Sequence, residues 1–116
     1  MEIRDSLTVN GKGVFTTQKY KKNDIIFVLS GQVFTGPTRE TIHVGNNVHI
    51  YDNFGIFINH SFTPNIYING TNVTSLRDIE IDEELAFNYN DNEINMASPF
   101  YVNNVLVNGK NLNKIH

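Results

Sequence analysis

The stretch Phe57-Ile58-Asn59-His60-Ser61-Phe62-Thr63-Pro64-Asn65 passes from apolar to polar within a few residues. It starts as an apolar turn and stops at a proline, which can neither continue a helix nor donate to the hydrogen bonds of a central sheet. Asn59 lies at its centre, with a side chain that carries two donor hydrogens and one acceptor oxygen. The change of character predicts a buried segment that opens into a pocket.

Length and composition describe one folded domain, which we expect to span residues 1–116. Hydrophobic residues make up 40% of the chain and charged residues 18%, as in a globular protein with a fairly neutral surface. Because there is no cysteine, neither disulfides nor thiolate metal sites are expected. The net charge of −3 argues against direct binding of nucleic acid and suits a cationic partner better.

The start of the chain, Met1–Asp5, has no basic region followed by an apolar run. No other stretch approaches the length needed to span a membrane. We therefore expect an intracellular protein, cytoplasmic or nuclear, with no membrane association.

Short strand-like segments alternate with glycine-containing and Asn-Gly turns along most of the chain. Hairpins are expected around Asn10-Gly11, Gly45-Asn46-Asn47 and Asn69-Gly70. The continuous apolar run Ile25–Leu29 predicts a strand that is buried on both faces. One turn of helix is expected at 93–97, and the pattern as a whole is mostly β with little helix.

The histidines suggest a metal site, but the spacing of His43, His49 and His60 matches none of the strong zinc patterns, so no metal is predicted. Ser61 follows His60 without a nucleophile-elbow motif, which argues against a catalytic triad. The acidic run 78–84 is expected to be a solvated loop, or an attractant for a basic peptide if it flanks a pocket.

Two features leave a functional and a structural interpretation open. The glycines of Gly11-Lys12-Gly13 allow the backbone to approach another strand or a ligand closely. Phe87 and Tyr89 are two apart in a predicted strand, so their rings would share one face. Such rings are most often core, but a channel walled by them would accept an alkylammonium chain through cation–π contacts, without a formal charge.

Three blocks of this sequence, in this order, resemble those of the SET-domain family of lysine methyltransferases. Gly11-Lys12-Gly13-Val14-Phe15 is similar to the family's opening Gly-X-Gly block. Phe57-Ile58-Asn59-His60-Ser61, with Pro64-Asn65, resembles its Asn-His-Ser-X-X-Pro-Asn signature. Glu84-Leu85-Ala86-Phe87-Asn88-Tyr89 resembles its Glu-Leu-X-Phe/Tyr-Asp-Tyr block. Each block alone is a weak to moderate signal, but the three together are specific.

The resemblance implies several small β-sheets and a C-terminal segment that threads through a loop as a pseudoknot, which brings the second and third blocks side by side. It also implies S-adenosylmethionine as the methyl donor. The backbone of Gly11, Lys12 and Gly13 would lie near the donor's methionine end, and that of Asn59 and His60 would read its adenine. The Asn59 side chain would hold the donor's amino or carboxylate end.

The resemblance further assigns a catalytic role to Tyr89, at the junction of the lysine channel and the methyl group. Phe54, Phe87 and Tyr89 are expected to wall this channel. A lysine amine, with a free pKa of about 10.4, must lose its proton, and burial beside a sulfonium lowers its pKa. The Phe87 position resembles the family's Phe/Tyr switch, and phenylalanine leaves room for di- or trimethylation.

The chain also departs from the family pattern. Asn88 stands where the family usually has aspartate, and Phe62 stands where many members have a zinc-binding cysteine. Since the zinc-bound cap is missing, we expect Met96–Val107 to close the channel, with Phe100 stacking on adenine; a partner subunit in a homodimer is the other option. The helical insert that binds substrate in larger members is very short here, between Phe34 and Tyr51.

The leading hypothesis is therefore an S-adenosylmethionine-dependent methyltransferase that acts on lysine in a protein or peptide, histones included. One alternative is a catalytically weak module of this type that binds peptide or donor without turnover. The other is a methyltransferase of a small amine.

Overall fold

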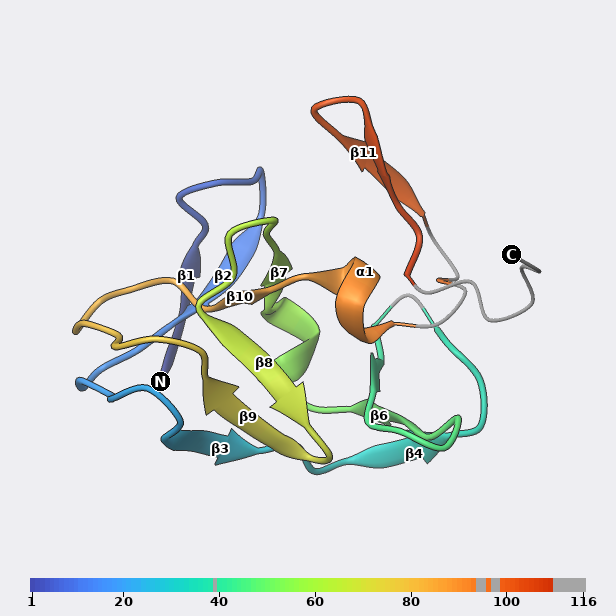
Figure 1. Cartoon of the computed structure of the whole chain (residues 1–116), viewed down its shortest axis with the longest axis horizontal. Helices are drawn as coiled ribbons and strands as arrows, with labels where there is room; N and C mark the ends of the chain where they lie inside the picture. The colour runs from blue at the N-terminus through green and yellow to red at the C-terminus, as the bar shows by residue number, and fades with distance from the viewer. Residues whose placement is uncertain (39, 94–95, 97–98, 110–116) are drawn as a thin grey trace.

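The computed structural model describes residues 1–38, 40–93, 96 and 99–109 (Figure 1). In this part of the chain the elements are short strands with very little helix. The strands are β1 (Glu2–Asp5), β2 (Lys12–Phe15), β3 (Ile25–Val28), β4 (Gln32–Phe34), β5 (Ile42–His43), β6 (His49–Tyr51), β7 (Asn59–His60), β8 (Ile66–Asn69), β9 (Asn72–Ser75), β10 (Ala86–Phe87), β11 (Phe100–Val102) and β12 (Val105–Val107). The helical segments are the 3₁₀ turn η1 (Gly55–Phe57) and α1 (Tyr89–Asn92).

These strands form several small sheets rather than one large one. Two sheets have three strands, in the orders β3-β9-β8 and β4-β6-β5. The others are the pairs β1-β2, β7-β10 and β11-β12. The predicted fold class, mostly β with small sheets and little helix, is confirmed. No helix among the described residues is both long and apolar enough to cross a membrane.

The hairpins formed where turn residues predicted them. Asn46 and Asn47 adopt positive φ values of 51° and 57° between β5 and β6, and Gly70 turns between β8 and β9 at φ 60°. The first hairpin is less tight than expected, because β1 ends at Asp5 and a loop precedes β2. A hydrogen bond from Ser6 N to Gly11 O, 2.8 Å long, closes this loop.

The prediction for Ile25–Leu29 was wrong. Strand β3 lies at the edge of its sheet and pairs only with β9 (Figure 1). Ile25 and Val28 are 55% and 53% exposed. Ile26 and Phe27 are partly buried against the core, and Leu29, just after the strand, is fully buried in it. A continuous apolar run does not by itself distinguish a central strand from an edge strand.

The core lies beneath the blocks quoted above. Its most buried residues lie in three strands, directly after η1, and in the segment that leads to β10. They are Val14 in β2, Ile58 after η1, Ile66 in β8, Val73 in β9, and Ile79 and Leu85 before β10. Gly55 packs tightly here, because a Cβ at this position would come within 2.9 Å of Leu29 and 3.0 Å of Ile42. This close contact fixes η1, which leads directly into β7.

The pairing of β7 with β10 brings the second and third blocks together. It is parallel, with Asn59 opposite Ala86 and His60 opposite Phe87. In Figure 1 the segment containing β10 crosses the middle of the molecule and runs into α1. The side-by-side arrangement expected of the pseudoknot is thus present, and the threading itself stays a prediction.

The strand predicted to contain both Phe87 and Tyr89 ends at Phe87. Asn88 caps helix α1 by accepting a hydrogen bond of 3.0 Å from Asn90 N, so Tyr89 begins a helix. Asparagine is a preferred N-cap residue, which explains the change of backbone direction after Phe87. The turn of helix predicted at 93–97 lies largely on residues outside those described.

The hairpin β11–β12 stands out from the body at the top of Figure 1. Asn90 fastens its base: the side-chain amide donates to Leu106 O at 3.1 Å and accepts from Asn108 N and Gly109 N at 3.1 and 3.0 Å. The hairpin is thereby tied to the residue immediately after Tyr89.

Candidate functional site

The glycine block and Asn59 meet at the start of β7. Asn59 Nδ2 donates to Lys12 O at 2.9 Å and to Glu84 Oε2 at 3.0 Å, so both of its amide hydrogens are used within the protein. A Cβ on Gly13 would overlap the Glu84 carboxylate and lie 3.3 Å from Asn59 Nδ2. The group that approaches this glycine is therefore a pair of side chains from the other two blocks.

Glu84 connects the segments that meet here through the hydrogen bonds that its carboxylate accepts. Besides Asn59, its carboxylate accepts hydrogen bonds from Ser6 Oγ at 3.0 and 2.9 Å and from Leu7 N at 2.9 Å. It thus holds the loop between β1 and β2 against β7. Sequence reasoning grouped Glu84 with the acidic loop and missed this role, because nothing local distinguishes it from its neighbours.

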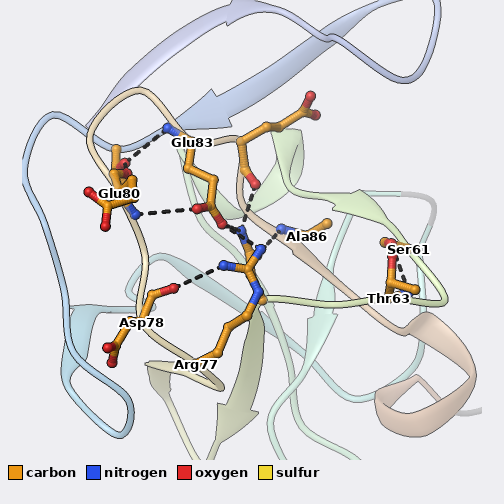
Figure 2. Close-up of polar contacts among 10 residues, drawn as sticks. Ser61, Thr63, Arg77, Asp78, Glu80, Glu83 and Ala86 are labelled. Atoms are coloured by element: carbon orange, nitrogen blue, oxygen red, sulfur yellow. Dashed lines mark hydrogen bonds and ion pairs between the residues drawn. The ribbon is translucent and has the colours of Figure 1, made fainter.

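The Glu83 carboxylate faces the guanidinium of Arg77, as Figure 2 shows. It pairs with Arg77 Nη2 at 2.7 Å and accepts from Asn65 Nδ2 at 2.7 Å. Burial raises the pKa of Glu83, but the hydrogen bonds from Arg77, Asn65 and the backbone of Glu80 outweigh it and leave the pKa below its ordinary value. The expectation of a solvated loop holds for Glu80 and Asp82, and is wrong for Glu83 and Glu84.

Asn65, the last residue of the opening stretch, joins the second block to the third. Its amide donates to Glu84 O at 2.8 Å and accepts from Ala86 N at 2.9 Å, and its own N–H donates to Ala86 O at 3.2 Å. The side chain is buried with these partners in place. It thereby sets the register in which the third block lies beside β7.

His60 positions Tyr89. Tyr89 N donates to His60 Nδ1 at 3.0 Å, so this nitrogen is unprotonated and the ring hydrogen of the neutral form is on Nε2. Burial lowers the pKa of His60, which favours the neutral form. Nε2 is buried and has no partner among the described residues. The ring stands edge-on to Phe62 and Phe100, with centroids 4.4 and 6.0 Å away.

Tyr89 is held as a neutral phenol. Its hydroxyl donates to Ile58 O. Burial, and after it the negative charge of Glu93, raises the pKa of Tyr89. Its ring lies 4.7 Å from that of Phe87 and 6.1 Å from that of Phe100. The rings of Phe87 and Tyr89 are together as predicted, although Tyr89 is in a helix.

A cavity of about 440 Å³ lies against these rings. Its walls are Pro37, Thr38, Glu40, Thr41, Ile42, Gly55, Ile56, Ile58, Phe87, Tyr89, Glu93, Met96, Pro99 and Phe100. Phe54, predicted to wall the channel, is not among them, and its ring packs edge-on against Phe27 with centroids 6.3 Å apart. The cavity thus has aromatic walls around Tyr89, as expected. It also contains the carboxylates of Glu40 and Glu93, which were not expected in this channel.

Glu93 is the second functional candidate that sequence reasoning missed. It is only 6% exposed. Its carboxylate accepts hydrogen bonds from His43 N at 3.1 and 3.3 Å and from Asn92 Nδ2 at 2.6 Å. Burial raises the pKa of Glu93 to about 7 in spite of these bonds.

The structure brings most of the predicted residues into one continuous site. Lys12, Gly13 and Asn59 meet at the Glu84 corner, and His60 links this corner to Tyr89, Phe87 and Phe100. Gly11 lies at the end of the loop between β1 and β2, with a φ of 148° and open space around it. No three histidine, aspartate or glutamate side chains of the described residues are grouped as metal ligands would be.

Comparison with known proteins identifies the family of the chain. The family model of the SET domain matches residues 11–90. A solved structure from Plasmodium falciparum, titled a "putative histone methyltransferase", is 27% identical and superposes with a TM-score of 0.60, covering 76% of this chain and 94% of that one. No curated protein sequence matches significantly.

Proposed function

The chain belongs to the SET-domain family, and from this premise we propose that it transfers methyl groups from S-adenosylmethionine to lysine side chains of a protein. The observation that carries the proposal is the position of Tyr89. It joins the Asn59-His60 segment, through His60 Nδ1, to the aromatic end of a cavity large enough for a side chain. A histone, or another cytoplasmic or nuclear protein, is the substrate class we propose.

The residues around His60 fit the donor. His60 Nε2 is a buried hydrogen-bond donor without a partner among the described residues, and it suits an acceptor on adenine or ribose. The Phe100 ring, 37% exposed and 6.0 Å from that of His60, offers a face for the adenine. S-adenosylmethionine supplies an electrophilic methyl group on a sulfonium.

The Asn59 side chain can offer a ligand only a hydrogen-bond acceptor. Because Lys12 O and Glu84 use both of its amide hydrogens, only Oδ1, an acceptor, is available to a ligand. An acceptor selects the amino end of the donor rather than its carboxylate. The backbone of Gly11, Lys12 and Gly13, beside Asn59, would lie along the donor's methionine part.

Tyr89 would orient the substrate amine. A lysine amine with a pKa of about 10.4 must be neutral to act as a nucleophile, and burial in the cavity lowers its pKa. Since the Tyr89 hydroxyl donates to Ile58 O, its oxygen lone pairs remain to accept an N–H of the amine. The raised pKa of Tyr89 keeps it from acting as a phenolate base. Its contribution is alignment.

Phe87 would set the number of methyl groups. It is buried against Tyr89 and has no hydroxyl with which to hold a water beside the amine. The space that such a water would take is then available to methyl groups, which favours di- or trimethyl-lysine.

Met96 and Phe100 both line the cavity, so the described residues of the segment 96–107 would close it in place of a zinc-bound cap. Residues 97 and 98 of this segment lie outside the described part of the chain. A second copy of the chain in a homodimer is the alternative way to complete this closure. We further propose that residues 1–116 form one domain.

The test is to incubate the protein with methyl-labelled S-adenosylmethionine and a panel of basic proteins, histones and a cell lysate included. Label on protein lysines supports the proposal. No label on any substrate, with measurable donor binding, would instead indicate the binding module, and label in a small-molecule fraction alone would indicate an enzyme of small amines.

A further inference from the structure

We propose that Glu93 binds the ammonium group of the substrate side chain in this cavity, an inference that rests on the lysine-methylating function proposed above. Because a carboxylate favours the charged form of an amine, Glu93 would bind the ammonium as it enters the cavity, before it loses to solvent the proton that must leave ahead of methyl transfer. Aromatic walls attract a cation without a formal charge, whereas a buried carboxylate forms a charge-assisted hydrogen bond with it.

The Glu93 carboxylate has no cation to balance its charge among the described residues. A buried carboxylate is costly unless it is paired with a cation or fully hydrogen-bonded. Glu93 receives hydrogen bonds from two neutral donor groups, His43 N and Asn92 Nδ2, against an acceptor capacity of about four. None of the ion pairs among the described residues includes it. The raised pKa of Glu93 is the direction expected for a carboxylate without a cation.

Glu93 also lies beside Tyr89 in the wall of the cavity. Glu93 follows Tyr89 by one helical turn, and Glu93 N donates to Tyr89 O at 2.8 Å. Residues four apart lie on the same side of a helix, and both side chains line the same cavity. A group bound at Glu93 is therefore beside the phenol proposed to orient the amine.

The charged side chains in the described walls of the cavity are all acidic. Its described walls carry two carboxylates, Glu93 inside and the exposed Glu40, and no lysine or arginine. A partly enclosed site lined by one sign of charge concentrates ligands of the opposite sign. The cavity is thus built for a cation at the end of an apolar chain, which describes a lysine side chain.

The experiment uses two small probes, n-butylammonium chloride and the neutral n-butanol, followed by NMR in wild type and variants. Glu93→Gln keeps an oxygen that can accept from His43 N and removes the charge. We expect it to weaken butylammonium binding by about tenfold and to leave butanol binding unchanged. Glu40→Gln, which removes the exposed carboxylate of the same cavity, is the matched control and should change butylammonium binding by about twofold at most.

A second measurement needs no variant. The side-chain carboxyl carbon of Glu93 in the wild type should move to the shift of an ionised carboxylate as butylammonium is added, and should not move with butanol. Glu93→Asp, which retains the charge, should retain a preference for butylammonium over butanol.

Equal butylammonium binding by wild type and Glu93→Gln would overturn the inference. So would a loss of S-adenosylmethionine affinity in Glu93→Gln that matches its loss of butylammonium affinity, because Glu93 would then face the donor. If the wild type binds butylammonium through Glu93 but methylates no lysine, the proposed function fails and the cation site stands.

Discussion

Replacing Glu93 with glutamine should change how the stability of the protein depends on pH. The pKa of Glu93 is raised in the folded protein from 4.5 to about 7, so between these values the folded state holds a proton that the unfolded state has released. The stabilisation that the raised pKa of Glu93 contributes to the folded state is fully present below pH 4.5 and is lost as the pH rises through about 7. At about 1.4 kcal/mol for each pKa unit, the loss amounts to at most about 3 kcal/mol.

Glutamine does not titrate, so the free energy of unfolding of Glu93→Gln should lack this decline. Urea unfolding, followed by circular dichroism at several values between pH 4.5 and pH 8, measures the difference between the two proteins. His49 and His60, whose pKa values burial lowers, titrate in both proteins and cancel in the difference. Glu40→Gln, at an exposed position, should stay within about 0.5 kcal/mol of wild type throughout.

We expect wild type to lose up to about 3 kcal/mol relative to Glu93→Gln as the pH rises across this range. A difference that is independent of pH, or that changes in favour of wild type, would contradict a raised pKa for Glu93. It would mean that the folded protein already balances the charge of Glu93, and the argument for a cation-binding carboxylate would lose its basis.

Other substitutions test the rest of the site. Gly13→Ala should lower the free energy of unfolding by about 1–3 kcal/mol, because the new Cβ overlaps the Glu84 carboxylate; urea unfolding that shows no loss, or no partial recovery when Glu84→Ala is added, would contradict this contact. Asn65→Leu leaves Ala86 N and Glu84 O without their hydrogen-bond partner and should lower the free energy of unfolding by about 1–3 kcal/mol. An unfolding midpoint equal to that of wild type would show that these hydrogen bonds do not stabilise the fold. Phe87→Tyr should shift the products toward monomethyl-lysine, as read by mass spectrometry, and an unchanged product distribution would remove Phe87 as the switch.

The parts of the fold that local chemistry encodes were predictable from sequence. The turns at Asn46-Asn47 and at Gly70 require positive φ angles, which asparagine and glycine adopt readily, so the hairpins around them could be placed. The exposure of Ile25 and Val28 could not be placed, because an apolar run carries no mark of its position in a sheet.

Local sequence signals did not predict the contacts between segments that are distant along the chain. No local signal pairs Asn59-His60 with Ala86-Phe87, and that expectation came from the resemblance of the three blocks to a known family. The position of Asn88 between two aromatic residues predicted a strand. Instead Asn88 caps a helix, as asparagine often does, so Tyr89 is the first residue of α1.

The two glutamates show where sequence reasoning ends. Glu84 and Glu93 lie among other polar residues, and only the fold shows that the first holds Ser6, Leu7 and Asn59 and that the second is buried beside Tyr89. A carboxylate's burial depends on which distant segments cover it, and sequence separation hides this.

The central claim is that Tyr89 lies where a methyl group reaches a lysine of a protein. Mass spectrometry of the protein panel after incubation with S-adenosylmethionine, for wild type and Tyr89→Phe side by side, tests it most directly. We predict methylated lysines with wild type and, because the amine is no longer aligned, a decrease of about a hundredfold with Tyr89→Phe, while donor binding is retained. Lysine methylation at equal rates by the two proteins, or methyl groups on other residues only, would contradict it.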